Sequence, residues 1–306
     1  MRKSMIADGI LLLVALVWGA TFVVVQNAIA TLPPLTFNGV RFLLASVFLL
    51  LFLLLFYRPQ LHKMNGKLVI AGMILGIWLF CGYAFQTIGL LYTSSSKAGF
   101  ITGLSVVLVP VFALLILKQR PKPPAVIGVM LATVGLYLLT LGDTINVNEG
   151  DVLVFLCAIS FALQIIFTGR YAPQFPSLAL AFVQILTVAV LSGGAAFFFE
   201  DWQTTLTWKT LATPTVYWAL LITAVPATAL AFLAQTECQR FTTATRVALI
   251  FAMEPVFAAA TAYLFNEEIL GGRALIGCLF IFIGMILAEL QPEQVMSWVK
   301  KRKTSF

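Results

Sequence analysis

Ten apolar segments, each about as long as a membrane-spanning helix, account for most of this 306-residue chain. A bilayer core of roughly 30 Å requires about 20 apolar residues per helix. The segments lie near residues 7–28, 35–57, 68–91, 99–117, 124–141, 151–170, 177–199, 216–237, 247–265 and 272–290. Of all residues 61% are hydrophobic and 10% charged, whereas about 25% are charged in soluble domains. Barrel strands would show shorter segments of alternating polarity. We therefore predict an all-α integral membrane protein with ten transmembrane helices.

The last five segments repeat the first five. Similar residues recur at an offset of 143 early in each copy and 149 later, as in Asp8 with Asp151, Pro33 with Pro176, Thr93 with Thr242, and Gly135 with Gly284. The six extra residues fit one longer connection in the second copy, at 200–215. Because five is odd, the second copy is inverted relative to the first. We predict two inverted five-helix repeats, at 1–145 and 146–291, followed by a basic cytoplasmic tail at 292–306.

The positions of lysine and arginine predict the orientation. With the N-terminus in the cytoplasm, fifteen of these residues fall on the inner side and three on the outer side, as in most multi-pass membrane proteins. We predict a cell (plasma) membrane location with both termini cytoplasmic. The first segment has a repeat partner at 151–170, which favours a retained helix over a signal peptide. The net charge of +7 follows from this topology and requires no nucleic-acid partner.

Motifs for catalysis, metal binding and nucleotide hydrolysis are absent from the sequence. His62 is the only histidine, the four cysteines form no CxxC motif, and no GxxxxGK[ST] loop occurs. These absences argue against histidine-based catalysis, a metal site and a self-contained ATP-driven pump. We expect no enzyme activity, no catalytic residue, no metal and no cofactor.

Several motifs resemble those of EamA-type members of the drug/metabolite transporter superfamily. They are the stretch 92–104, its repeat partner 241–258, Trp18-Gly-Ala-Thr-Phe, Arg41-Phe-Leu-Leu-Ala and Asn266-Glu-Glu. The resemblance covers nearly the whole chain and implies a ten-helix inverted repeat whose central cavity is reached alternately from each side. The copies differ where Ser105 stands opposite Glu254 and Val106 opposite Pro255. This difference argues against a mechanism in which both halves are chemically equal.

Glu254 is the deepest acidic residue in the predicted membrane region. It lies roughly ten Å from the cytoplasmic end of the ninth segment, at 1.5 Å per residue. A charge at the bilayer centre costs roughly 2.5 to 3.5 kcal/mol on insertion scales, and Pro255 beside it cannot donate a backbone hydrogen bond. We predict a kinked polar site. Glu254 there contacts a substrate amine, carries a proton, or makes a structural hydrogen bond or ion pair.

Arg41 is the basic counterpart in the second segment, one to two turns below the outer surface. Its side chain either extends outward to the membrane surface or reaches inward to a substrate carboxylate. Polar residues also recur at equivalent positions of both copies, which predicts that they converge near the midplane. The predicted substrate-binding residues are Trp18, Thr21, Arg41, Tyr83, Gln86, Ser105, Ser160, Gln164, Gln184, Gln235 and Glu254. Hydrogen bonding between helices is the alternative role for each.

Lys97 and Arg246 begin the fourth and ninth segments. They act either as gates or as anchors of helix ends at the headgroups. The glycines at 128, 135, 277 and 284 recur at seven-residue spacing, which favours close packing of the fifth and tenth helices or a dimer contact.

The expected function is that of a secondary transporter working by alternating access. The resemblance implies export of small organic metabolites such as amino acids or amphipathic compounds, with Glu254 as a candidate for proton coupling. The expected partners are the lipid bilayer and a small-molecule substrate, and the expected state is a monomer or weak homodimer. The alternative is a non-transporting membrane scaffold or lipid-handling protein of the same fold.

Overall fold

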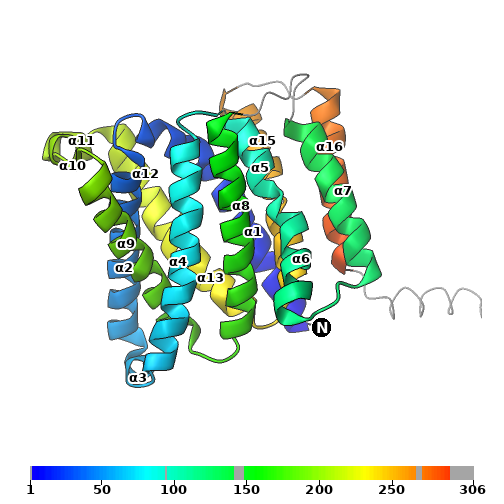
Figure 1. Ribbon diagram of the computed structural model, residues 1–306, viewed down its shortest axis with the longest axis horizontal. Helices are drawn as coiled ribbons and strands as arrows, with labels where there is room; N and C mark the ends of the chain where they lie inside the picture. Colours follow the sequence, from blue (N-terminus) through cyan, green and yellow to red (C-terminus); the bar gives the residue numbers. More distant parts are fainter. Residues whose placement is uncertain (1, 94, 141–147, 267–270, 290–306) are drawn as a thin grey trace, which may run out of the picture.

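The computed structural model describes residues 2–93, 95–140, 148–266 and 271–289, and in these ranges the chain forms helices and no strands. Long helices stand side by side across the molecule (Figure 1). The helices of the first half are α1 (Arg2–Ile29), α2 (Pro34–Phe56), α3 (Arg58–His62), α4 (Gly66–Gly89), α5 (Ser95–Gly103), α6 (Ser105–Leu117) and α7 (Pro123–Thr140). Those of the second half are α8 (Glu149–Tyr171), α9 (Ser177–Phe199), α10 (Trp202–Thr205), α11 (Trp208–Leu211), α12 (Pro214–Ala224), the π-helix η1 (Val225–Leu230), α13 (Ala231–Cys238), α14 (Ala244–Phe251), α15 (Glu254–Asn266) and α16 (Gly272–Glu289).

Two ends of the helix bundle serve as reference points. The lower face carries the start of α1 and the short helix α3, and the upper face carries α10 and α11 (Figure 1). Helices α1, α4, α7, α9 and the α14–α15 segment rise from the lower to the upper face. Helices α2, α8 and α16 and the α5–α6 and α12–α13 segments descend.

Eight helical segments in the described part of the chain are long and apolar enough to cross a membrane. Two further apolar helices, α7 and α16, are shorter. Many large apolar side chains point outward, among them Leu55 at 67% exposure and Phe198 at 78%. An apolar exterior of this kind is stable in lipid. The chain is therefore a multi-pass membrane protein, and eight of the ten predicted crossings satisfy length and composition.

Two membrane segments are interrupted at equivalent positions of the two copies. Leu104 separates α5 from α6, and Ala252 with Met253 separates α14 from α15. Pro255 follows the second break, and because it has no N–H, the carbonyl of Phe251 loses its usual helical partner. The break expected beside Glu254 is thus present, and it places that residue in the first turn of α15.

Extensive contacts join the two halves of the chain. Helix α2 packs against α9, α4 against α8 and α9, and α7 against α16. In the last pair the backbones approach closely, since a Cβ atom on Gly277 would lie 2.6 Å from the carbonyl oxygen of Gly135. The recurring glycines therefore lie where α7 meets α16, in agreement with packing of the fifth and tenth helices within the monomer.

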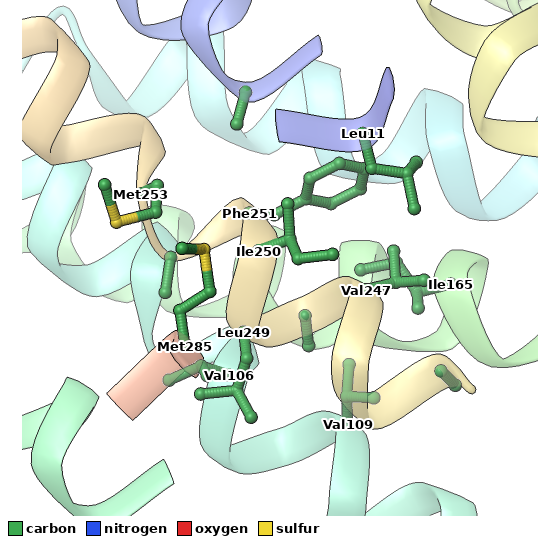
Figure 2. Close-up of a cluster of buried hydrophobic side chains, with 14 of the residues drawn as sticks. Leu11, Val106, Val109, Ile165, Val247, Leu249, Ile250, Phe251, Met253 and Met285 are labelled. Carbon is green, nitrogen blue, oxygen red and sulfur yellow. The ribbon is translucent and has the colours of Figure 1, made fainter. Parts of the chain in front are cut away.

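Apolar side chains fill the lower half of the bundle around α6 and α14. We call this set the lower apolar cluster, and Figure 2 shows its central members. They are Leu11, Val106, Val109, Ile165, Val247, Leu249, Ile250, Phe251, Met253 and Met285. All are at most 9% exposed, so the lower part of the bundle is tightly packed between α1, α6, α8, α14 and α16.

Candidate functional site

A cavity of about 290 Å³ lies at the centre of the bundle and extends toward the upper face. Its walls come mainly from the upper parts of α1, α2, α4, α5 and α15, and its floor from the middle of α8, from α13 and from the end of α14. The lower apolar cluster lies below it, and its members Ile165 and Phe251 form part of the cavity floor. The cavity thus occupies the part of the molecule where both interrupted segments change from one helix to the next.

Nine of the eleven residues predicted to bind substrate line this cavity. They are Trp18, Thr21, Arg41, Tyr83, Gln86, Ser105, Gln164, Gln235 and Glu254. The other two do not line it. The Ser160 hydroxyl donates to the carbonyl of Leu156 at 2.8 Å, and Gln184 is fully buried within α9.

Arg41 reaches inward rather than outward, because its side chain lines the cavity and the residue is only 2% exposed. Its Nε donates to the Thr228 hydroxyl at 2.7 Å, and its guanidinium carbon lies 4.9 Å from the centre of the Tyr83 ring. Within the described residues, no carboxylate forms an ion pair with it. A buried arginine held by a hydroxyl and an aromatic face can still accept an anionic ligand.

Glu254 borders the same cavity from the opposite half of the chain. No ion pair or hydrogen bond from the described residues reaches its carboxylate. The structural hydrogen bond or ion pair considered for this residue is therefore not found there. Glu254 is instead available to a cationic ligand group or a proton.

Aromatic side chains form one wall of the cavity. The ring of Trp18 lies 5.3 Å from that of Phe232 and 4.9 Å from that of Phe251, and Tyr83 lies 5.3 Å from Phe161. The Trp18 Nε1 donates to the carbonyl of Ala227 at 2.8 Å, which fixes the indole. Sequence reasoning missed the three phenylalanines. The repeat offers a signal, because Phe161 is equivalent to Trp18 and Phe232 to Tyr83.

Amide and hydroxyl groups cross the floor of the cavity. Gln235 Nε2 donates to Gln164 Oε1, and Gln164 Nε2 donates to Thr168 Oγ1, each at 3.0 Å. Gln235 Oε1 has no hydrogen-bond partner in the described part of the chain. These residues therefore bond α8 to α13 beneath the cavity, and Gln235 Oε1 is a buried acceptor beside them.

Comparisons with known proteins agree with this architecture. The model of the EamA-like transporter family matches residues 5–141 and again 148–290. The chain belongs to the EamA-like transporter family. An uncharacterized transporter of Archaeoglobus fulgidus is 36% identical over 94% of this chain and 87% of its own. The transporter YvbV of Bacillus subtilis is 26% identical over 93% and 92% of the two chains. A solved crystal structure matches in fold, with a TM-score of 0.76, 17% identity and coverage of 93% and 97%.

This EamA-family membrane transporter contains two ion pairs at equivalent positions of its copies. Lys97 Nζ lies 2.5 Å from Asp151 near the upper face, and Arg246 lies 2.8 Å from Asp8 near the lower face. Both aspartates are at most 5% exposed. The two basic side chains, each 19% exposed, therefore pair within the protein. The aspartates recur in the repeat, but the sequence alone did not identify them as partners of Lys97 and Arg246.

Proposed function

We propose that this EamA-family transporter is a secondary carrier for small organic molecules that bear both an amine and a carboxylate, such as amino acids. The observation that carries the proposal is the pair of charges on one membrane-embedded cavity. Arg41 and Glu254 both line it, and neither has an ion-pair partner in the described residues. Two separate charges of opposite sign, each costly in a membrane, match the two charges of a zwitterion.

The cavity offers a matching group to the carboxylate, to the ammonium group and to the side chain of such a molecule. A carboxylate makes charge-assisted hydrogen bonds with the Arg41 guanidinium. An ammonium group is attracted by the Glu254 carboxylate, which lines the cavity. An apolar side chain packs on the wall of Trp18 and its neighbouring phenylalanines. The volume of about 290 Å³ lies at the small end of the roughly 300 to 1,000 Å³ typical of ligand sites.

The proposed architecture is ten crossings in two inverted repeats, at 1–145 and 146–291, followed by a basic tail. Three findings support it. The family model matches each half separately, the helix breaks at Leu104 and Met253 are equivalent, and the ion pairs of Lys97 and Arg246 lie near opposite faces. Inverted repeats of this kind place the substrate near the midplane and let each half open in turn.

The proposed orientation places the lower face in the cytoplasm, with both chain ends on that side of the cell membrane. Basic residues in connections at the lower face support this, including Arg58, Lys63, Lys118, Arg120 and Arg240. The structure then corresponds to an outward-facing form, because the cavity extends upward while the lower apolar cluster fills the space below. Export as the direction rests on the family resemblance.

Transport is proposed to be driven by a gradient, since the sequence has no phosphate-binding GxxxxGK[ST] loop. Glu254 is the candidate for coupling to protons. The coupling test compares uptake into liposomes with and without a pH gradient, for the wild type and Glu254→Gln. A glutamine at this position cannot exchange a proton, so we expect the pH-dependent component to disappear. Retention of that component would exclude Glu254 as the proton carrier.

Counterflow in proteoliposomes tests the proposed carrier. Vesicles loaded with an unlabelled amino acid receive traces of the same radiolabelled compound, for each compound of a panel. Each is matched with the amine that lacks its carboxylate and the acid that lacks its amine. We expect exchange of at least one amino acid and little exchange of its matched analogues. Equal exchange of the analogues would contradict a zwitterion site, and exchange of none of the panel would contradict an amino-acid carrier.

A further inference from the structure

Two buried amides outside the cavity lack hydrogen-bond partners within the described residues. Gln184 in α9 is 0% exposed and Gln239, the C-cap of α13, is 3% exposed. Neither the Nε2 nor the Oε1 atom of either side chain is bonded there. A buried polar group without a partner costs about 1 to 3 kcal/mol. Apolar side chains of similar size would avoid that cost, so these two amides call for an explanation.

Gln184 lies at about the level of the cavity floor, and Gln239 lies below it. Helix α9 rises from Ser177, so Gln184 is about 10 Å above its lower end at 1.5 Å per residue. Helix α13 descends, and Gln239 lies one turn below the cavity-lining Gln235, to whose carbonyl its backbone N–H donates at 2.9 Å. Gln184 therefore borders the level of the cavity floor from α9, and Gln239 lies beneath that floor on α13.

A strip of polar groups leads downward from the floor of the cavity. Gln235 bonds to Gln164 across the α8–α13 interface, and Gln164 bonds to Thr168 one turn lower on α8. Thr168 is fully buried. Polar groups thus continue downward from the cavity on two adjacent helices. Beside them, Ile165 and Val247 belong to the lower apolar cluster (Figure 2).

The residues at the equivalent positions of the first copy indicate a role for the two amides. Gln184 is equivalent to Arg41 at the offset of 143, and Gln239 is equivalent to Leu90 at the offset of 149. Arg41 and Leu90 both line the cavity. When two inverted halves exchange their conformations, residues of one half take the surroundings of their equivalents in the other. Gln184 and Gln239 would then line a cavity that opens at the lower face.

We infer that Gln184 and Gln239 are the polar substrate contacts of the lower half of the path, exposed when α6 and α14 separate. This inference rests on the proposed carrier function. An amide both donates and accepts hydrogen bonds, so Gln184 offers an uncharged contact to the carboxylate that Arg41 holds in the present form. The lower half of the site therefore binds the same zwitterion without a cationic group.

Cysteine accessibility tests the inference without any substrate. In a variant lacking Cys81, Cys157, Cys238 and Cys278, Gln184→Cys and Gln239→Cys are made singly. A membrane-impermeant methanethiosulfonate reagent is added to vesicles whose lower face is outside. Labelling of Lys63→Cys, and not of Trp208→Cys, verifies that orientation, since the two residues lie on opposite faces.

The matched control is Val188→Cys. Val188 lies one turn above Gln184 on α9, is fully buried, and is equivalent to Ala45, which does not line the cavity. We expect both test cysteines to be labelled at least about fivefold faster than the control. A fivefold difference in labelling rate corresponds to a free energy of opening around the cysteine that is lower by about 1 kcal/mol. Rates equal to that of Val188→Cys would overturn the inference. The labelling can succeed even if no amino acid is exchanged, so the two proposals fail independently.

Replacement of the amide by an apolar group adds a second readout. Gln184→Leu removes two unpartnered polar atoms from a buried site, so we expect an unchanged or higher Tm. If Gln184 contacts substrate, counterflow of the amino-acid panel falls about fivefold or more in the same variant. A lower Tm would show that the amide stabilises the fold. Unchanged counterflow would show that it does not contact substrate.

Discussion

At the scale of single residues, the two cavity charges decide what the site can bind. A charged side chain at membrane depth costs roughly 2.5 to 3.5 kcal/mol on insertion scales, and an opposite charge nearby usually offsets that cost. Arg41 and Glu254 line one cavity without such a partner in the described residues. A zwitterionic ligand would supply both missing charges while it is bound.

Neutral replacements of these two residues are predicted to change selectivity in opposite ways. Arg41→Gln removes the carboxylate contact, so amino-acid exchange falls about tenfold or more, the equivalent of a charge-assisted hydrogen bond of about 1.5 to 3 kcal/mol. Exchange of the matched amine changes little. Glu254→Gln removes the ammonium contact, so amino-acid exchange falls while exchange of the matched acid changes little. Counterflow measures both, with Ser160→Ala as a control outside the cavity. A comparable loss of amino-acid exchange in Ser160→Ala would show that the loss does not depend on the cavity charges.

The sequence revealed some site residues and concealed others for clear physical reasons. Arg41 and Glu254 stand out because charges are rare in apolar segments. Phe161, Phe232 and Phe251 carry no such signal, since the chain contains 26 phenylalanines and most apolar residues face lipid or core. Ser160 follows the same helical spacing as Gln164 but bonds its own helix. Periodicity defines a face, whereas packing decides which part of that face meets the cavity.

At the scale of helices, the two equivalent ion pairs tie the first helix of each copy to the fourth helix of the other. Lys97 of α5 pairs with Asp151 of α8, and Arg246 of α14 pairs with Asp8 of α1. Both pairs are formed in the same structure, although the cavity extends toward only one face. The two pairs therefore connect α5 with α8 and α14 with α1 in this structure.

Loss of one aspartate is predicted to destabilise the bundle. Asp151→Asn removes the charge that pairs with Lys97 at 2.5 Å, so we expect the free energy of unfolding to fall by about 1 to 3 kcal/mol, less than for a fully buried pair because Lys97 is 19% exposed. Thermal unfolding in detergent measures it. The exposed Glu237–Arg240 pair provides the control Arg240→Gln, with an expected change below about 0.5 kcal/mol. The exchanged pair Lys97→Asp with Asp151→Lys should recover part of the loss. If Asp151→Asn and Arg240→Gln lower the free energy of unfolding equally, the internal Lys97–Asp151 pair stabilises the bundle no more than the exposed pair does.

Close backbone contact between α7 and α16 leads to a second stability prediction. In Gly277→Ala the added Cβ would lie 2.6 Å from the Gly135 carbonyl oxygen, so the two helices must separate and Tm falls. Gly9→Ala is the matched control, because a Cβ there meets nothing within 4 Å and alanine favours helix. Its Tm should stay the same or rise. A Tm of Gly277→Ala equal to that of the control would refute the close approach.

At the scale of the whole molecule, the sequence predicted the helical membrane class and the order of the segments. Apolar length and composition carry that information directly. Helix breaks at Leu104 and Met253 are harder to predict, because only the second has a proline nearby. The direction in which the cavity extends depends on which contact closes the bundle, that of α6 with α14 in the lower half or that of α5 with α15 in the upper half. The same apolar pattern is compatible with either closure.

The proposed orientation is open to a direct test in intact cells. Trp208→Cys lies on the upper face and is 88% exposed, so an impermeant thiol reagent should label it from outside. Lys63→Cys, exposed at the lower face, should react only after permeabilisation. Both variants lack the four native cysteines. The reverse pattern would place the upper face in the cytoplasm.

The central claim is that one cavity is reached in turn from both faces, and labelling of Ser105→Cys tests it most directly. Ser105 lines the cavity at the start of α6, and cysteine is a close substitute in size. In sealed vesicles of each orientation, we expect an impermeant reagent to label Ser105→Cys from the upper face and, more slowly, from the lower face. Ser160→Cys, buried outside the cavity, should stay unlabelled in both. Reaction of Ser105→Cys from one face alone would contradict alternating access.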